Sequence, residues 1–265
     1  MRRFVVAVLV SIFIPTACLA WGEKGHKVVA TIALNYLSEN AHSEVEDLLG
    51  DTSQFVELSI WADQVRFSRP DTAPWHFVDI PFDGGAFNAS RDCPNNDCVV
   101  AKIAEFTQTV GNKQLAKPVR AEALKWLIHF VADVHQPLHS ADDNDRGGNE
   151  VWVRIGGKTD RLHSLWDTGL VNQLGDTPTD IATALIGGIS DVTASTWRGG
   201  TAVDWANESF HIAHAFIYAR SRGKNTKSTP IFLPDSYFDD ATPYVSQRIE
   251  MASVRLAWIL NQGLR

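Results

Sequence analysis

The stretch PVRAEALKWLIHFVADVHQPLH, residues 118–139, decides the fold class. Its apolar residues recur at helical spacing, and Pro118 stands where the first turn of a helix tolerates proline. Pro137 lacks a backbone N–H and will end or distort a helix. The stretch therefore predicts a long helix over 118–135, apolar mostly on one side, that stops at a proline turn.

The same helical periodicity runs through most of the 265 residues. It predicts further helices over 26–37, 41–49, 53–67, 203–223 and 242–263. Strand signal is scarce: VWVRI at 151–155 and the residues after Gly156-Gly157 predict one hairpin. Segments 68–98 and 140–150 are rich in Asp, Asn, Gly and Pro, which is typical of loops. We therefore expect a mainly α single compact helical domain with one small β-hairpin.

Residues 1–20 differ from the rest of the chain. Two arginines precede the apolar run FVVAVLVSIFI, and small residues stand one and three positions before a cut after Ala20. The run is too short for a membrane span, and no other stretch is long and apolar enough. We expect a signal peptide over 1–20, a mature domain over 21–265, and export to the periplasm or the extracellular space without a membrane anchor. A lipoprotein acylated on Cys18 is the alternative, which Pro15 disfavours.

The cysteine count and the net charge indicate which class of protein this is. Without the leader, the chain keeps Cys93 and Cys98 in DCPNNDC, and an even count in an exported protein indicates a local disulfide, with two free thiols as the alternative. The net charge is −7, and −9 without the two leader arginines. Non-specific nucleic-acid binders are usually basic, so acidity argues against nucleic acid unless bound cations reverse the local charge.

Histidine and aspartate recur at fixed spacings. His129 and Asp133 are four residues apart, as are His163 and Asp167 in HSLWD, so each pair shares one helix face. His139 follows the first helix end beside the same face. Imidazole and carboxylate together suit zinc. Either pair alone is also the spacing of a helix salt bridge, but together they predict a metal site, for which there are further candidates: His26, Asp63 and His76.

Other histidines have simpler interpretations. His135 faces away from Asp133 on the helix, so we expect a supporting or core position. His211 and His214 fall on one late helix, and we interpret both as structural or surface residues.

The motifs WGxxGH, WAD, WHFVD, HFVADVHQPLH, GGN and HSLWD together resemble those of the zinc-dependent single-strand nucleases and 3′-nucleotidases of the S1/P1 (type I) family, relatives of the zinc phospholipases C. They occur in family order between Trp21 and Asp167. The resemblance implies three Zn²⁺ ions. One ion is implied to bind Asp63, His76, His129 and Asp133. A second is implied to bind His139, His163 and Asp167. A third is implied to bind His26, Asp133, and the amine and carbonyl of Trp21, which requires Trp21 to be the first residue of the mature chain.

The resemblance also implies how substrate binds. Asp63 orients the attacking water and Arg66 contacts the scissile phosphate, while Phe77 stacks on a base whose edge hydrogen-bonds to Asp79 and Asn149. A surface arginine and a core phenylalanine are the alternatives for Arg66 and Phe77. The implied substrates are single-stranded DNA and RNA, cut to 5′-phosphate products, and 3′-nucleotides. Three Zn²⁺ ions would offset the acidic charge within the cleft.

Two other functions fit parts of the pattern. A phospholipase C would share the fold and most ligands, but it has Glu at the position of Asp167. A non-catalytic zinc protein would close its metal sites with protein ligands, whereas the ligands here leave positions open. We therefore expect an exported zinc-dependent endonuclease, with monomer as the default state.

Overall fold

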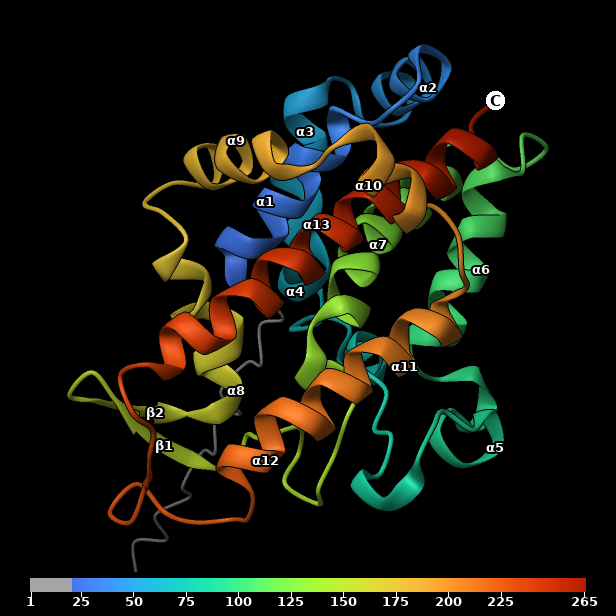
Figure 1. Ribbon diagram of the computed structural model, residues 1–265. Coiled ribbons are helices and arrows are strands. Elements are labelled where there is room, and N and C mark those ends of the chain that lie inside the picture. The colour runs from blue at the N-terminus through green and yellow to red at the C-terminus, as the bar shows by residue number, and fades with distance from the viewer. Residues whose placement is uncertain (1–20) are drawn as a thin grey trace, which may run out of the picture.

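The computed structural model describes residues 21–265, and the predicted signal peptide lies outside the described residues. Helices form most of the protein (Figure 1). The α-helices are α1 (Gly22–Leu34), α2 (Glu39–Leu49), α3 (Thr52–Glu57), α4 (Trp61–Val65), α5 (Ala89–Asp92), α6 (Val99–Gly111), α7 (Lys117–His135), α8 (Leu162–Ser164), α9 (Pro178–Gly188), α10 (Asp191–Trp197), α11 (Ala202–Ile212), α12 (Tyr218–Ser221) and α13 (Tyr237–Gly263). Short 3-10 or π turns between them include η1 (Leu58–Ile60), η2 (Pro70–His76), η5 (Pro137–His139), η6 (Leu165–Gly169) and η8 (Ala213–Ile217).

Helix α7 is the central element of the molecule. It packs against α6, α11 and α13, and α1 lies beside α13 (Figure 1). Every residue from Trp126 to His135 is buried, so this half of α7 is covered on all sides. A helix buried all round belongs to the interior of a domain. Its polar residues therefore have no access to bulk water and must find partners inside the protein.

The predicted end of this helix is confirmed. Helix α7 stops at His135, and Pro137 opens the single 3-10 turn η5. Proline suits the first position of a helical turn, where no backbone donor is needed. This turn places the residues of η5 against α7, the helix that precedes them.

A small sheet lies at one end of the molecule. Strands β1 (Trp152–Ile155) and β2 (Lys158–Arg161) pair antiparallel, which confirms the predicted hairpin. Gly156 and Gly157 both have positive φ, as a two-residue hairpin turn requires. A third strand, β3 (Ile231–Phe232), pairs parallel to β1 and was not predicted. Two residues are too few for a periodicity signal.

Several helices differ from the sequence-based prediction. The expected helix over 53–67 is broken into α3, η1 and α4, and the one over 203–223 contains the π turn η8. Helices α6, α9 and α10 were not predicted at all. The mainly α, single-domain prediction is nevertheless confirmed.

Two smaller features complete the fold. Cys93 and Cys98 form the predicted disulfide, with an S–S length of 2.06 Å. Among the residues that the structure describes, no helix has the length and apolar character of a membrane span.

Candidate metal centre

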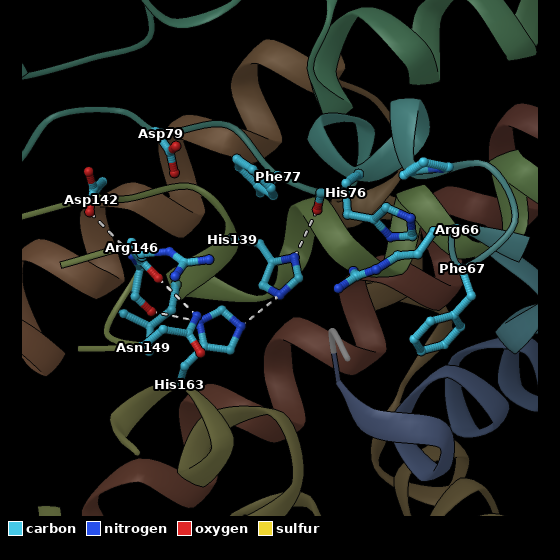
Figure 2. A pocket seen from close by; sticks show the side chains of 14 residues that line it. Arg66, Phe67, His76, Phe77, Asp79, His139, Asp142, Arg146, Asn149 and His163 are labelled. Carbon is cyan, nitrogen blue, oxygen red and sulfur yellow. Dashed lines mark hydrogen bonds between the residues drawn. The ribbon is translucent and has the colours of Figure 1, made fainter. Parts of the chain in front are cut away.

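A cleft of about 400 Å³ opens beside the ends of α4 and α7. Figure 2 shows its side chains, which include the buried His139 and His163 and the exposed rings of Phe67 and Phe77. The lining combines charged, aromatic and histidine side chains, among them Arg66, Phe67, His76, Phe77, Asp79, His139, Asp142, Arg146, Asn149 and His163. A concave site with convergent polar groups is the usual form of an active site.

Three groups of His and Asp lie at and below the floor of this cleft. In each group, one ligand atom of every residue lies within 4.8 Å of the others, and all members are buried. The first group is Asp63, His76 and His129; the second is His26, His129 and Asp133; the third is His139, His163 and Asp167. Asp133 also joins the first group, because its Oδ2 lies 3.1 Å from His76 Nδ1 and 3.3 Å from His129 Nε2. All eight side chains proposed from the sequence are therefore close together.

Seven separate elements supply these eight residues. His129 and Asp133 stand one turn apart on α7, and their shared face points toward α1 and α4. His26 comes from α1, Asp63 from α4, His76 from the end of η2 and His139 from η5. His163 lies in α8 and Asp167 in the π turn η6 that follows it. Wide π turns occur often at functional sites.

Backbone carbonyls determine which nitrogen of three histidines faces the site. Nδ1 of His129 lies 2.7 Å from the Ser59 carbonyl, Nδ1 of His139 lies 2.8 Å from the His76 carbonyl, and Nδ1 of His163 lies 2.6 Å from the Gly147 carbonyl. Only a protonated nitrogen can donate to a carbonyl, so Nδ1 carries the hydrogen in each of these bonds and Nε2 is the nitrogen that faces the site. Metal-binding histidines are typically held in this way.

The third group, His139, His163 and Asp167, has the geometry of a metal site. Nε2 of His139 and Nε2 of His163 lie 3.1 Å apart, and Asp167 Oδ2 lies 3.1 Å from the latter nitrogen. Two unprotonated nitrogens repel each other unless a cation lies between them. Burial lowers the pKa of His139, so a proton is disfavoured in that position. A divalent cation satisfies all three atoms.

The other two groups also favour a cation. Within residues 21–265, Asp63 Oδ1 and His26 Nδ1 are buried without a hydrogen-bond partner, and His26 Nε2 lies 3.3 Å from Asp133 Oδ1. Burial raises the pKa of Asp63 to about 7. Burial acts in the same direction on Asp133, but His129 and neighbouring donors outweigh it and hold its pKa well below the usual range. Unpartnered carboxylate oxygens beside imidazole nitrogens suit zinc-type coordination.

Trp21 lies against the same helix face. Its side chain is fully buried, and its indole Nε1 donates a 2.9 Å hydrogen bond to the carbonyl of Ala132, the residue before Asp133. Its own carbonyl accepts from the backbone N–H of Gly25. Gly22, with φ of +54°, lets the chain enter α1 while Trp21 keeps this position.

The remaining predicted residues lie around the cleft. Arg66 Nη1 is 3.7 Å from Asp63 Oδ1, so this arginine is not a free surface residue. Phe77 is 37% exposed and lines the cleft, which excludes the core-packing alternative. Asp79 and Asn149 line the cleft on the Phe77 side of His139 and His163 (Figure 2).

Comparison with known proteins agrees with this geometry. The model of the S1/P1 Nuclease family matches residues 21–265. The chain belongs to the S1/P1 nuclease family. Nuclease PA3 of Penicillium sp is 31% identical over 266 residues, which cover 91% of this chain and 97% of the relative. Nuclease S1 of Aspergillus oryzae is 30% identical over 271 residues, 90% of each chain, and Endonuclease 2 of Arabidopsis thaliana is 28% identical over 271 residues, 91% of this chain and 90% of the relative.

Membership of the S1/P1 nuclease family confirms the resemblance seen in the motifs. The protein is an enzyme, a hydrolase that acts on phosphodiester bonds, and its substrates are nucleic acids. The three His and Asp groups give this S1/P1 nuclease the means to bind metal.

Sequence reasoning missed several residues that complete the site of this S1/P1 nuclease. Gln136 is buried and its side-chain amide donates to Asp167 Oδ1, which orients that carboxylate. Gly147 has φ of +61°, and a Cβ there would lie 2.5 Å from the Leu138 carbonyl oxygen. Only glycine can therefore bring its carbonyl so close to His163. Gln136 lies inside the motif HQPLH and Gly147 inside GGN, so the signal was present although neither residue was given a role.

Proposed function

We propose that this S1/P1 nuclease is an exported, trinuclear-zinc endonuclease that cuts single-stranded DNA and RNA to 5′-phosphate products and also removes phosphate from 3′-nucleotides. In this proposal residues 1–20 are a signal peptide and residues 21–265 are the mature enzyme. It acts as a monomer in the periplasm or outside the cell.

One observation carries the proposal: three buried His and Asp groups converge beside a cleft that also holds an exposed aromatic ring. Eight imidazole and carboxylate ligands exceed what a single tetrahedral ion needs, so three ions fit better than one. The donor set of nitrogen and oxygen atoms suits Zn²⁺.

Zinc bound here would supply water that is acidic near neutral pH and positive charge beside the phosphate. The residues of the chain do the rest. Asp63 is buried beside Arg66 and in reach of the cleft, where its carboxylate orients the attacking water. The Arg66 guanidinium binds phosphate oxygens, and its planar donors can bind two at once.

A base pocket explains the preference for single strands. Phe77 stacks on the base of the nucleotide whose 3′-oxygen leaves, and Asp79 with Asn149 hydrogen-bonds the edge of that base. A base that is paired and stacked in a duplex cannot enter such a pocket without unpairing. The substrate must therefore be single-stranded at the cut.

The mature N-terminus contributes the last metal ligands in this proposal. Cleavage after Ala20 frees the amine of Trp21, whose indole is already anchored to the backbone next to Asp133. A free amine and the adjacent carbonyl can both coordinate a metal ion, whereas an internal peptide N–H cannot. Processing then completes the site.

The test uses mature protein that begins at Trp21 and a form with one extra residue before it. Each is incubated separately with single-stranded DNA, single-stranded RNA, 3′-AMP and phosphatidylcholine, before and after EDTA, and again after Zn²⁺ is restored. Bound zinc is counted by elemental analysis. Cleavage to 5′-phosphate ends that EDTA abolishes and zinc restores supports the proposal, as does a loss of bound zinc in the extended form. Hydrolysis of phosphatidylcholine instead of nucleic acid would show that the enzyme is a phospholipase C. Zinc binding without either activity would show a non-catalytic protein, and absence of zinc would overturn the metal site.

A further inference from the structure

A second exposed ring lines the cleft opposite the base pocket. Phe67 is 71% exposed and directly follows Arg66. Figure 2 shows Arg66 and Phe67 on one side of His139 and His163, with Asp79 and Asn149 on the other. Apolar lining continues from Phe67 through Pro70 and Ala73. The cleft therefore carries a second exposed ring on the Arg66 side of His139 and His163, away from Asp79 and Asn149.

The backbone holds Phe67 in a defined place. The N–H groups of Ser68 and Arg69 both donate to the Val65 carbonyl, at 3.0 and 2.9 Å, so the chain around Phe67 forms a closed turn after α4. Arg69 is tied to Glu122 of α7 by a 2.7 Å ion pair. The exposed ring thus stands on an anchored turn. Its backbone is already ordered, so little conformational entropy is lost when a ligand binds the ring.

The path of a bound strand follows from the site. In the proposed function, Phe77 stacks on the base of the nucleotide that loses its 3′-phosphate, and that phosphate lies beside Arg66. The next nucleotide of the strand keeps the phosphate as its 5′ group. It must leave the cleft past Arg66, which is the side of Phe67.

We propose that Phe67 is a specificity-determining residue that stacks on the base of the nucleotide just downstream of the scissile phosphate. This inference rests on the proposed function. An aromatic ring accepts any base, because every base has a π face. The contact exists for a polynucleotide and is absent for a 3′-mononucleotide, so Phe67 favours internal cleavage over removal of a terminal 3′-phosphate.

The test compares two substrates that differ only downstream of the cut, adenylyl-3′,5′-adenosine and 3′-AMP. Loss of one base–aromatic stack corresponds to a roughly five- to 150-fold fall in kcat/KM. We expect this fall for Phe67→Ala on the dinucleotide, with 3′-AMP hydrolysis unchanged. Phe67→Trp should keep the wild-type ratio of the two activities. Phe232→Ala removes an equally exposed ring, 73% accessible, from β3 outside the cleft, and should change neither activity.

A substrate with an abasic downstream sugar isolates the stack. Wild-type enzyme should cleave it as slowly as Phe67→Ala cleaves the intact dinucleotide, and the variant should lose nothing further. Equal losses on 3′-AMP and the dinucleotide would overturn the proposal, as would an unchanged rate on the dinucleotide.

A binding measurement separates this inference from the proposed function. A dinucleotide with a methylene group in place of the 3′ bridging oxygen is not cleaved, and 2-aminopurine as its downstream base reports stacking by fluorescence quenching. Weaker binding with less quenching in Phe67→Ala supports the stack even if the wild-type enzyme cleaves neither substrate, which would refute only the proposed function. Equal binding and quenching would refute the stack.

Discussion

Replacing Glu208 by Gln should destabilise the protein strongly, although this residue lies outside the cleft. Its carboxylate accepts hydrogen bonds from Arg248 Nη1 at 2.7 Å and from Arg255 Nη1 and Nη2 at 2.6 and 2.8 Å. Both arginines are buried, at 1% and 5% exposure. One carboxylate therefore neutralises part of the charge of two guanidinium groups inside the protein.

The magnitude follows from burial. Removing one partner of a buried ion pair costs about 3–5 kcal/mol. Glu208 is 37% exposed, so water can replace part of the interaction. Arg248 also keeps the carbonyls of His135 and Trp205 and the Ser209 hydroxyl as acceptors. We therefore expect a loss of about 2–3 kcal/mol in the free energy of unfolding, which corresponds to a Tm lower by roughly 4–12 °C.

Urea unfolding followed by tryptophan fluorescence measures this loss. The experiment is run at pH 7 in EDTA with the disulfide intact, so that metal binding does not contribute to stability. The midpoint should fall while the slope with urea stays unchanged. Glu57→Gln is a matched control, because Glu57 pairs with Lys27 at 2.8 Å but is 59% exposed, and it should cost less than about 1 kcal/mol. A loss for Glu208→Gln no larger than for this control would refute the reasoning.

Three further changes have defined outcomes. Burial raises the pKa of Glu250 to about 7, so ionisation of this carboxyl opposes folding as the pH rises from about 4.5 to 7. Glu250→Gln should therefore have a higher urea midpoint than wild type at pH 8 and the same midpoint at pH 4. An equal difference in midpoint at both pH values would contradict this. Gln136→Leu removes the donor that orients Asp167 and should weaken zinc binding roughly 10- to 100-fold. A competitive chelator titration measures this affinity, and an unchanged value would show that the amide has no orienting role. Phe77→Ala should raise the KM for 3′-AMP roughly five- to 150-fold through the lost stack, measured by phosphate release, and a normal KM would place the base elsewhere.

Local sequence patterns predicted the two longest described helices, α7 and α13, but missed α6 with its 13 residues. The apolar spacing that predicted 118–135 reports burial on a helix face, and Pro137 has the same effect in any context, so α7 and its end agree with the prediction. Helix α9 shows where this fails. Only Ile181 and Ala182 of α9 are buried, so it has too few core residues to produce a periodic signal.

The broken helix over 53–67 shows a tertiary effect. Its composition favours one continuous helix, but the structure inserts the 3-10 turn η1 at Leu58–Ile60. That turn contains Ser59, whose carbonyl accepts from His129 Nδ1. A contact between residues 70 positions apart thus coincides with the break, and no local pattern contains it.

The sequence by itself determined the ligand types of the metal centre and the pairing of His129 with Asp133 and of His163 with Asp167, because i, i+4 spacing is a property of one helical segment. Only the tertiary structure decided that seven elements between His26 and Asp167 converge and that carbonyls of Ser59, His76 and Gly147 orient the imidazoles. These contacts join residues far apart in the chain. They arise from the packing of the apolar faces around α7, which no single segment encodes.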